Sequence, residues 1–205
     1  MSTVSSVLTN DRPFAAIART ISDLLSPPIM AIPGLALGVW ASNAAGTYRY
    51  ALLYFAMGVL APVFYVLWLV KSGRVADFHL PNRRERVKPF AASLLFGVAG
   101  VALLVYLEAP AAFVGPLLAL LLQTLVLFAI TLAWQINIHT ATVAGLVTFA
   151  VLAIGPFAWL LSLLVPLVAW ARVYLGRHTV AQTLAGTAVG CMSFVALFAL
   201  RGLIW

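Results

Sequence analysis

The sequence predicts an all-α membrane protein, a polytopic bundle of six to seven transmembrane helices. Of its 205 residues, 64% are hydrophobic and only 8% are charged, and the mean hydropathy is +1.08. Water-soluble globular domains carry about 25% charged residues, so this composition excludes that class. The apolar residues also form runs that approach the roughly 20 residues a helix needs to cross a bilayer.

The first element is an N-terminal segment over residues 1–28, ahead of a transmembrane domain over 29–205. Asp11 and Pro13 can start a helix, and Ser26-Pro27-Pro28 ends it. Its large apolar residues fall on one face: Phe14, Ile17, Ile21, Leu24 and Leu25. We therefore predict an interfacial helix lying on the membrane, the alternative being a polar tail whose periodicity is accidental.

Apolar segments then follow at about 29–46, 48–70, 90–107, 111–133, 140–154, 156–171 and 180–204. The fifth and sixth are short and form either a helical hairpin or one long helix over 140–171, interrupted only by Gly155-Pro156. Glycine permits a turn, and a residue before proline avoids the α region, so the sequence favours a tight hairpin.

The positive charges gather on one side of the predicted bundle. The chain has 12 Lys and Arg against 5 Asp and Glu, a net charge of +7. With seven spans, all of these cations except Arg49 and Arg201 lie on one face. The positive-inside rule makes this the cytoplasmic face of the cell membrane. Because the charges occupy a few loops rather than a solvated surface, no nucleic-acid partner is expected.

Three polar segments interrupt the apolar pattern, at 77–90, 134–145 and 172–182. If Gly155-Pro156 is a turn, an even number of spans separates each segment from the next, and all three meet at one membrane face. If 140–171 were a single helix, the third segment would lie on the opposite face and no common site would form.

These segments contain all three histidines of the chain, His79, His139 and His178, beside several arginines. Ionisable groups at a membrane edge are costly and tend to be functional. So many cations beside so few carboxylates imply an anionic ligand, and arginine suits bidentate binding of phosphate. Histidine can serve as a nucleophile or an acid. The alternative interpretation is a topological or headgroup-binding role for Arg74 and Arg84 and no role for His79.

These residues resemble the type 2 phosphatidic acid phosphatase superfamily, whose motifs are K-x6-R-P, P-S-G-H and S-R-x5-H-x3-D. The third motif is matched from Ala171-Arg172 through His178 to Gln182, with Ala in place of Ser and Gln in place of Asp. Asn137-Ile138-His139 lies where the family has S-G-H. The first motif is not present as written, although Arg83, Arg86, Lys88 and Pro89 lie where its basic residues and proline are expected.

The resemblance implies a core of the same fold over about 77–190 and a role for each matched residue. His178 would be the nucleophile that forms a phosphohistidine, and His139 would protonate the leaving alkoxide. Arg172 would bind the phosphate oxygens, with Arg83, Arg86 and Lys88 as further candidates. The family is metal-independent, so no metal or other cofactor is expected. The implied substrate is a membrane-dissolved lipid phosphate or polyprenyl (di)phosphate.

Gln182 is the main departure from the family pattern, in which an Asp orients the nucleophilic histidine. Residues 178 and 182 share a helix face, so the amide oxygen of Gln182 can reach the imidazole but brings no charge. Loss of the equivalent carboxylate costs about 10⁴-fold in a serine-protease triad. Asp77 or Glu85, in the first polar segment, could supply the negative charge beside His178 that Gln182 lacks.

Two other functions fit the same residues. The cations could hold the diphosphate leaving group of a prenyl transferase or cyclase, although the usual Asp-rich Mg²⁺ motifs, also expected of a UbiA-like enzyme, are absent from the sequence. Alternatively, the chain binds or transports a lipid phosphate without catalysis, in which case Gln182 marks lost activity.

Overall fold

The structure is a computed structural model that describes residues 13–75 and 83–204, excluding the side chains of residues 83–84 and 201–204. The described residues form helices and no strands. In chain order the elements are α2 (Ala15–Leu24), α3 (Pro27–Ser42), α4 (Tyr48–Tyr54), η1 (Phe55–Leu60), α5 (Ala61–Lys71), α6 (Arg83–Tyr106), α7 (Ala111–Ala133), α8 (Ile138–Ile154), η2 (Pro156–Leu163), α9 (Leu164–Tyr174) and α10 (Val180–Ile204).

Five helical stretches within the described residues are long and apolar enough to cross a membrane: Tyr48–Lys71, Glu85–Tyr106, Ala111–Ala133, Pro156–Tyr174 and Val180–Leu200. A sixth arises if α2 and α3, which bend by 43° at their junction, form one span. Helix α8 is apolar but only 17 residues long. The all-helical prediction is therefore confirmed, and the predicted apolar segments lie mainly in helices. The described residues supply five candidate membrane spans, or six with α2 and α3, against the six to seven predicted, because α8 is too short to count as one.

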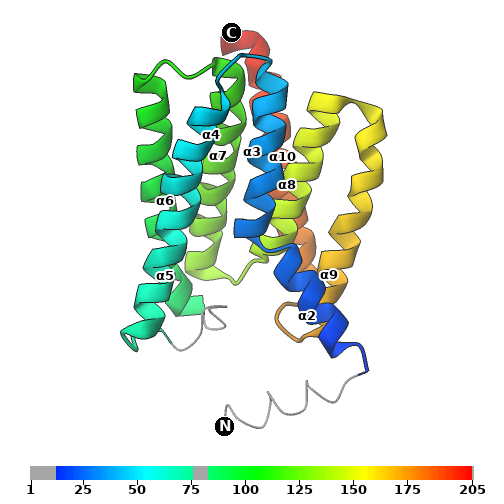
Figure 1. Cartoon of the computed structure of the whole chain (residues 1–205). Coiled ribbons are helices and arrows are strands. Elements are labelled where there is room, and N and C mark those ends of the chain that lie inside the picture. The colour runs from blue at the N-terminus through cyan, green and yellow to red at the C-terminus, as the bar shows by residue number, and fades with distance from the viewer. Residues whose placement is uncertain (1–12, 76–82, 205) are drawn as a thin grey trace.

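A reversal at Gly155 separates α8 from the stretch formed by η2 and α9. Gly155 has a φ of +101°, a conformation that residues with a Cβ rarely adopt, and Pro156 starts η2. Figure 1 shows α8 and α9 running side by side in opposite directions. The predicted hairpin is confirmed, and the segments before α8 and before α10 both lie at the end of the bundle away from the C-terminus (Figure 1).

The N-terminal helix α2 packs against α9, a contact that the sequence analysis did not predict. Its buried residues are the small Ala15, Ala18 and Ser22. The large residues Phe14, Ile17 and Leu24 are exposed. Small side chains allow close helix approach, whereas the exposed apolar face is suited to contact with lipid. The helix is thus amphipathic as predicted. Ile21 and Leu25 of the apolar stripe pack on the protein, and the Phe14 ring meets that of Tyr174 edge to face at a centroid distance of 6.5 Å.

Helices α8 and α10 form the closest helix pair. A Cβ on Gly186 would collide with the carbonyl oxygen of Asn137, and one on Gly190 with that of Ala141. The two glycines therefore let one backbone rest on the other. This contact fixes the start of α8 relative to the start of α10, where the second and third polar segments lie.

The opposite side of the bundle is less densely filled. Between α4 and α5 the helix widens into the π-helical turn η1, followed by Pro62, which cannot donate to the carbonyl of Gly58. Gly58 and Pro62 line a cavity of about 570 Å³, whose walls come mainly from α3, α5, α6, α7 and α8, with further residues from α2, α4, η1 and α10. The bundle thus combines one tightly packed helix pair with an apolar hollow beside it.

Candidate functional site

The three polar segments meet at one end of the bundle, as predicted. The described part of the site consists of the start of α6, the segment 134–137 with the start of α8, and the segment 175–179 with the start of α10 (Figure 1). Asp77, His79 and the side chains of Arg83 and Arg84 lie outside the described residues.

The first segment is helical from residue 83 onward, whereas the sequence analysis began the span at residue 90. Residues two apart on a helix point in nearly opposite directions. Arg86 is accordingly buried, and its Nη1 donates to the carbonyl oxygen of Ile136 at 3.5 Å, while Lys88 is exposed. Of these two predicted phosphate ligands, only Arg86 reaches the interior.

The end of α9 explains the spacing between Arg172 and His178. Gly176, with φ +66°, donates its N–H to the carbonyl oxygen of Val173 at 2.9 Å, and Arg177 donates to that of Arg172 at 3.0 Å. This is the Schellman arrangement that ends many helices. The N–H of His178 also donates to the carbonyl oxygen of Arg172, at 3.3 Å. The helix end therefore joins the two residues through the backbone.

Helix α10 begins with a capping box formed by Thr179 and Gln182. The Thr179 N–H donates to Gln182 Oε1 at 3.0 Å, and the Gln182 N–H donates to Thr179 Oγ1 at 3.3 Å. Gln182 Oε1 also lies 3.1 Å from Nδ1 of His178. The predicted contact between residues 178 and 182 is confirmed. The T-x-x-Q signal that explains a glutamine here was readable in the sequence but missed.

Gln182 determines which tautomer His178 adopts. Since a backbone N–H donates to Oε1, that atom is the oxygen of the amide and accepts from Nδ1–H of the imidazole. The Nε2 atom is then left with its lone pair, and it is buried without a hydrogen-bond partner among the described residues. Burial, followed by the positive charges of Arg172, Arg86 and Arg177, lowers the pKa of His178 to about 3. The ring is therefore neutral at pH 7.

The start of α8 is ordered by Asn137, which is fully buried. Its side-chain oxygen accepts from the N–H groups of His139 at 3.0 Å and Thr140 at 3.5 Å. The hydroxyl of Thr140 lies 3.1 Å from the carbonyl oxygen of Thr183 in α10. These bonds place His139, itself buried, at the contact of α8 with α10.

The side chain of Arg172 binds a residue that the sequence analysis had assigned to the membrane surface. Arg172 is 3% exposed, and its Nη1 donates to Oγ of Ser22 in α2 at 2.9 Å. Its Nε has no hydrogen-bond partner among the described residues. Asp23, next to Ser22, is the carboxylate whose charge acts on Arg172. No local pattern could reveal this contact, because 150 residues separate Ser22 from Arg172.

Neither of the two acids proposed as substitute partners has a described contact with His178. Asp77 lies outside the described residues, and Glu85 has a buried Oε2 atom without a hydrogen-bond partner in the described part of the chain. Within the same described ranges, no group of three or more His, Cys, Asp or Glu side chains is arranged to hold a metal ion.

The 570 Å³ cavity reaches part of this site, whereas Arg172, His178 and Gln182 are not among its lining residues. Arg86 and His139 are among its lining residues, as is Asp23. The remainder of the lining is predominantly apolar. The arrangement places the guanidinium group of Arg86 at one end of a largely apolar space.

Comparison of the chain with protein-family models, with curated proteins and with solved structures gives no match.

Proposed function

We propose that this protein is a membrane phosphatase that removes phosphate from a lipid phosphate or polyprenyl (di)phosphate through a phosphohistidine at His178. The observation that carries the proposal is the surroundings of this histidine. Its Nε2 is buried and unpartnered among the described residues, and three arginines act on it electrostatically.

The arginines support an anionic substrate. Arg86 and Arg172 are both less than 5% exposed, and the carboxylate of Asp23 is the acidic charge that acts on Arg172. Buried charges of one sign are unfavourable unless an opposite charge joins them. A phosphate group would supply that charge, and guanidinium groups bind its oxygens with suitable geometry.

The histidines support phosphoryl transfer rather than binding alone. The lone pair of His178 Nε2 attacks phosphorus, and the P–O bond to the lipid breaks as the N–P bond forms. His139 donates a proton to the leaving alkoxide. Water then attacks phosphorus and gives a proton to His139, while the N–P electron pair returns to His178. The arginines stabilise the negative charge on the phosphoryl oxygens throughout.

The cavity supports a substrate dissolved in the membrane. A headgroup held by Arg86 beside His139 would have its hydrocarbon part in the adjoining apolar space. This end of the bundle is also the one rich in cations, so we assign it to the cytoplasmic face.

A second function, binding of a lipid phosphate without turnover, is favoured by one observation. Gln182 is neutral, so it fixes the tautomer of His178 without stabilising an imidazolium. In that case the site would bind the same lipids tightly and form no covalent phosphate.

The test is release of phosphate from phosphatidic acid, phosphatidylglycerophosphate and polyprenyl phosphates by the purified chain in liposomes. We expect the wild type to turn over at least one lipid and His178→Ala to release none. We also expect Arg172→Ala to be strongly impaired and Arg49→Ala, a matched change at an exposed arginine in α4, to be unaffected.

Radiolabelled phosphate should be trapped on the wild type and not on His178→Ala. Equal release by His178→Ala would refute the nucleophile assignment. Saturable binding without release or labelling would establish the non-catalytic function instead.

A further inference from the structure

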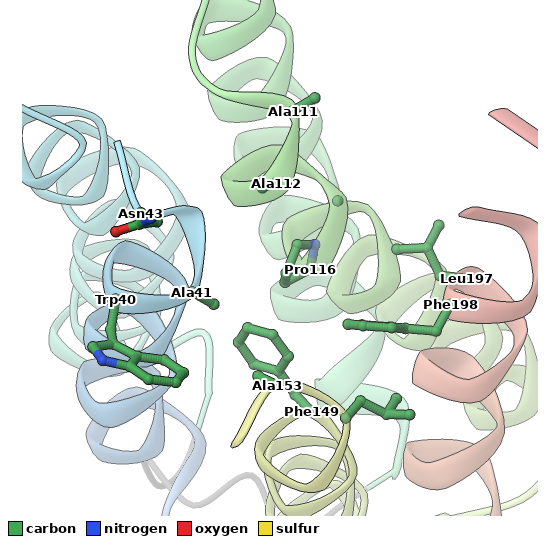
Figure 2. Close-up of a pocket in the computed structure, with 12 residues that line it drawn as sticks. Trp40, Ala41, Asn43, Ala111, Ala112, Pro116, Phe149, Ala153, Leu197 and Phe198 are labelled. Carbon is green, nitrogen blue, oxygen red and sulfur yellow. The ribbon is translucent and has the colours of Figure 1, made fainter. Parts of the chain in front are cut away.

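A second cavity lies beyond the first, toward the opposite end of the bundle. Its volume is about 460 Å³, and α3, α7, α8 and α10 supply its walls. Figure 2 shows Trp40, Pro116, Phe149 and Phe198 around it. Pro116 and Phe149 also line the 570 Å³ cavity, so the two spaces adjoin at these residues.

Phe149 lies where the two cavities adjoin and has the larger side chain of the two residues that line both. Its ring is 3% exposed and stacks on Phe194 of α10 at a centroid distance of 5.9 Å. It also contacts Phe198, one turn further along α10, at 6.3 Å. Phe194 lines the first cavity and Phe198 the second, whereas Phe149 lines both.

Several residues of the second cavity have small side chains. Ala112, Gly115 and Ala153 line it, and a Cβ on Gly115 would be 4.0 Å from its nearest neighbour, Leu197. Removing the Phe149 ring would therefore extend the first cavity into existing space rather than into packed side chains.

We propose that the 570 Å³ cavity holds one hydrocarbon chain of the lipid phosphate and that Phe149 sets the longest chain it accepts. This inference rests on the proposed function for the position of the phosphate, beside Arg86 and His139. A chain that starts there passes along the apolar lining and ends at the aromatic ring. Phe149 is thus a specificity-determining residue that touches only the far end of the substrate.

The test uses a series of straight-chain alkyl phosphates of increasing length, in detergent and with the full chain. For each length, kcat/KM is measured on the wild type, and binding is measured separately on His178→Ala. Each added methylene that enters the cavity should raise affinity about fourfold. We expect this gain to stop at a defined length, and that limit to move to longer chains in Phe149→Ala.

Phe149→Leu is the second variant, because it retains more of the packing if the alanine variant fails to fold. Phe198→Ala is the control, since this ring lines only the second cavity, and its limit should equal that of the wild type. An unchanged limit in both Phe149 variants, an equal shift in Phe198→Ala, or loss of binding by folded Phe149 variants at every length would overturn the inference.

The binding arm separates this inference from the proposed function. A length limit that moves with Phe149 in the absence of any turnover would refute the phosphatase and leave the chain-length role standing. Turnover with a length limit that is the same in the wild type and the Phe149 variants would support the phosphatase and refute the chain-length role of Phe149.

Discussion

The two sides of the bundle are packed to different standards. Where α8 meets α10, Gly186 and Gly190 bring backbone against backbone, and the hydroxyl of Thr140 bridges the two helices. On the other side, a cavity of about 570 Å³ lies between α3, α5, α6, α7 and the opposite face of α8. The difference indicates a division of labour, in which the first side holds His139 and His178 in register and the second side leaves room for an apolar ligand.

The largest effect is expected from Gly190→Ala. The new Cβ would collide with the carbonyl oxygen of Ala141 and lie 2.9 Å from the backbone nitrogen of Gly145, and neither atom can move aside cheaply. We expect a loss of about 3 kcal/mol or more in the free energy of unfolding, together with loss of the site. The melting temperature in detergent measures the first of these effects.

Gly115→Ala is the control for that substitution, because its Cβ would have no neighbour closer than 4.0 Å. Equal melting temperatures for Gly190→Ala and the wild type would show that α8 and α10 are not closely packed at this position.

Gln182→Leu is expected to have the next largest effect, on turnover. It removes the acceptor that holds Nδ1 of His178, so the tautomer with a free Nε2 is no longer favoured. We expect kcat to fall about 100-fold, at the lower end of the range for a displaced acid–base or nucleophilic group. Steady-state phosphate release in liposomes measures it.

Thr179→Ala separates orientation of the ring from capping of the helix. This change removes the hydroxyl that caps α10 but leaves Gln182 beside the ring. An equal fall in kcat for both variants would mean that Gln182 acts only through the helix end.

Acid should lower the stability of the protein through protonation of His178. Its pKa is about 3 in the folded protein, below the ordinary value of 6.5, so between these values the unfolded chain binds more protons. The stability linked to this group is fully present above about pH 6.5 and is lost as the pH falls toward about 3. The melting temperature of the wild type should therefore fall more steeply than that of His178→Asn over this window. Parallel curves would contradict the lowered pKa.

The smallest effect is expected from Thr140→Val, which removes the hydroxyl that contacts Thr183 and leaves the shape of the side chain almost unchanged. We expect a loss of about 1 kcal/mol, the usual contribution of one hydrogen bond. Thr124→Val, which removes a hydroxyl bonded only within α7, is the matched control. A smaller loss for Thr140→Val than for this control would show that the bridge to α10 adds nothing.

The sequence predicts the side of the bundle that contains α8, α10 and the histidines better than the side that contains the cavity. Features on the first side depend on residues close together in the chain. Gly155-Pro156 and the spacing from His178 to Gln182 act over a few residues, so local rules for turns and helix faces predict both the hairpin and the contact. The extension of α6 back to residue 83 was missed because charge was taken as a sign of a loop, although charged residues form helices well.

The partners of Arg172 and the cavity could not be predicted in this way. Ser22 reaches Arg172 only because α2 folds back onto α9. The cavity depends on side chains from many elements that leave a space unfilled. Hydrophobic periodicity describes each helix by itself and not the space that neighbouring helices leave empty.

The link between Arg172 and His178 bears on how this site tolerates change over evolution. It passes through the carbonyl oxygen of one residue and the N–H of the other, which every residue at position 172 and every non-proline residue at position 178 would supply. The side chains between them can therefore be exchanged while the geometry is kept, except at Gly176, whose φ of +66° favours glycine. Inserting or deleting one residue there would displace the histidine. The length of the segment between Arg172 and His178 is therefore more constrained than the identities of its residues.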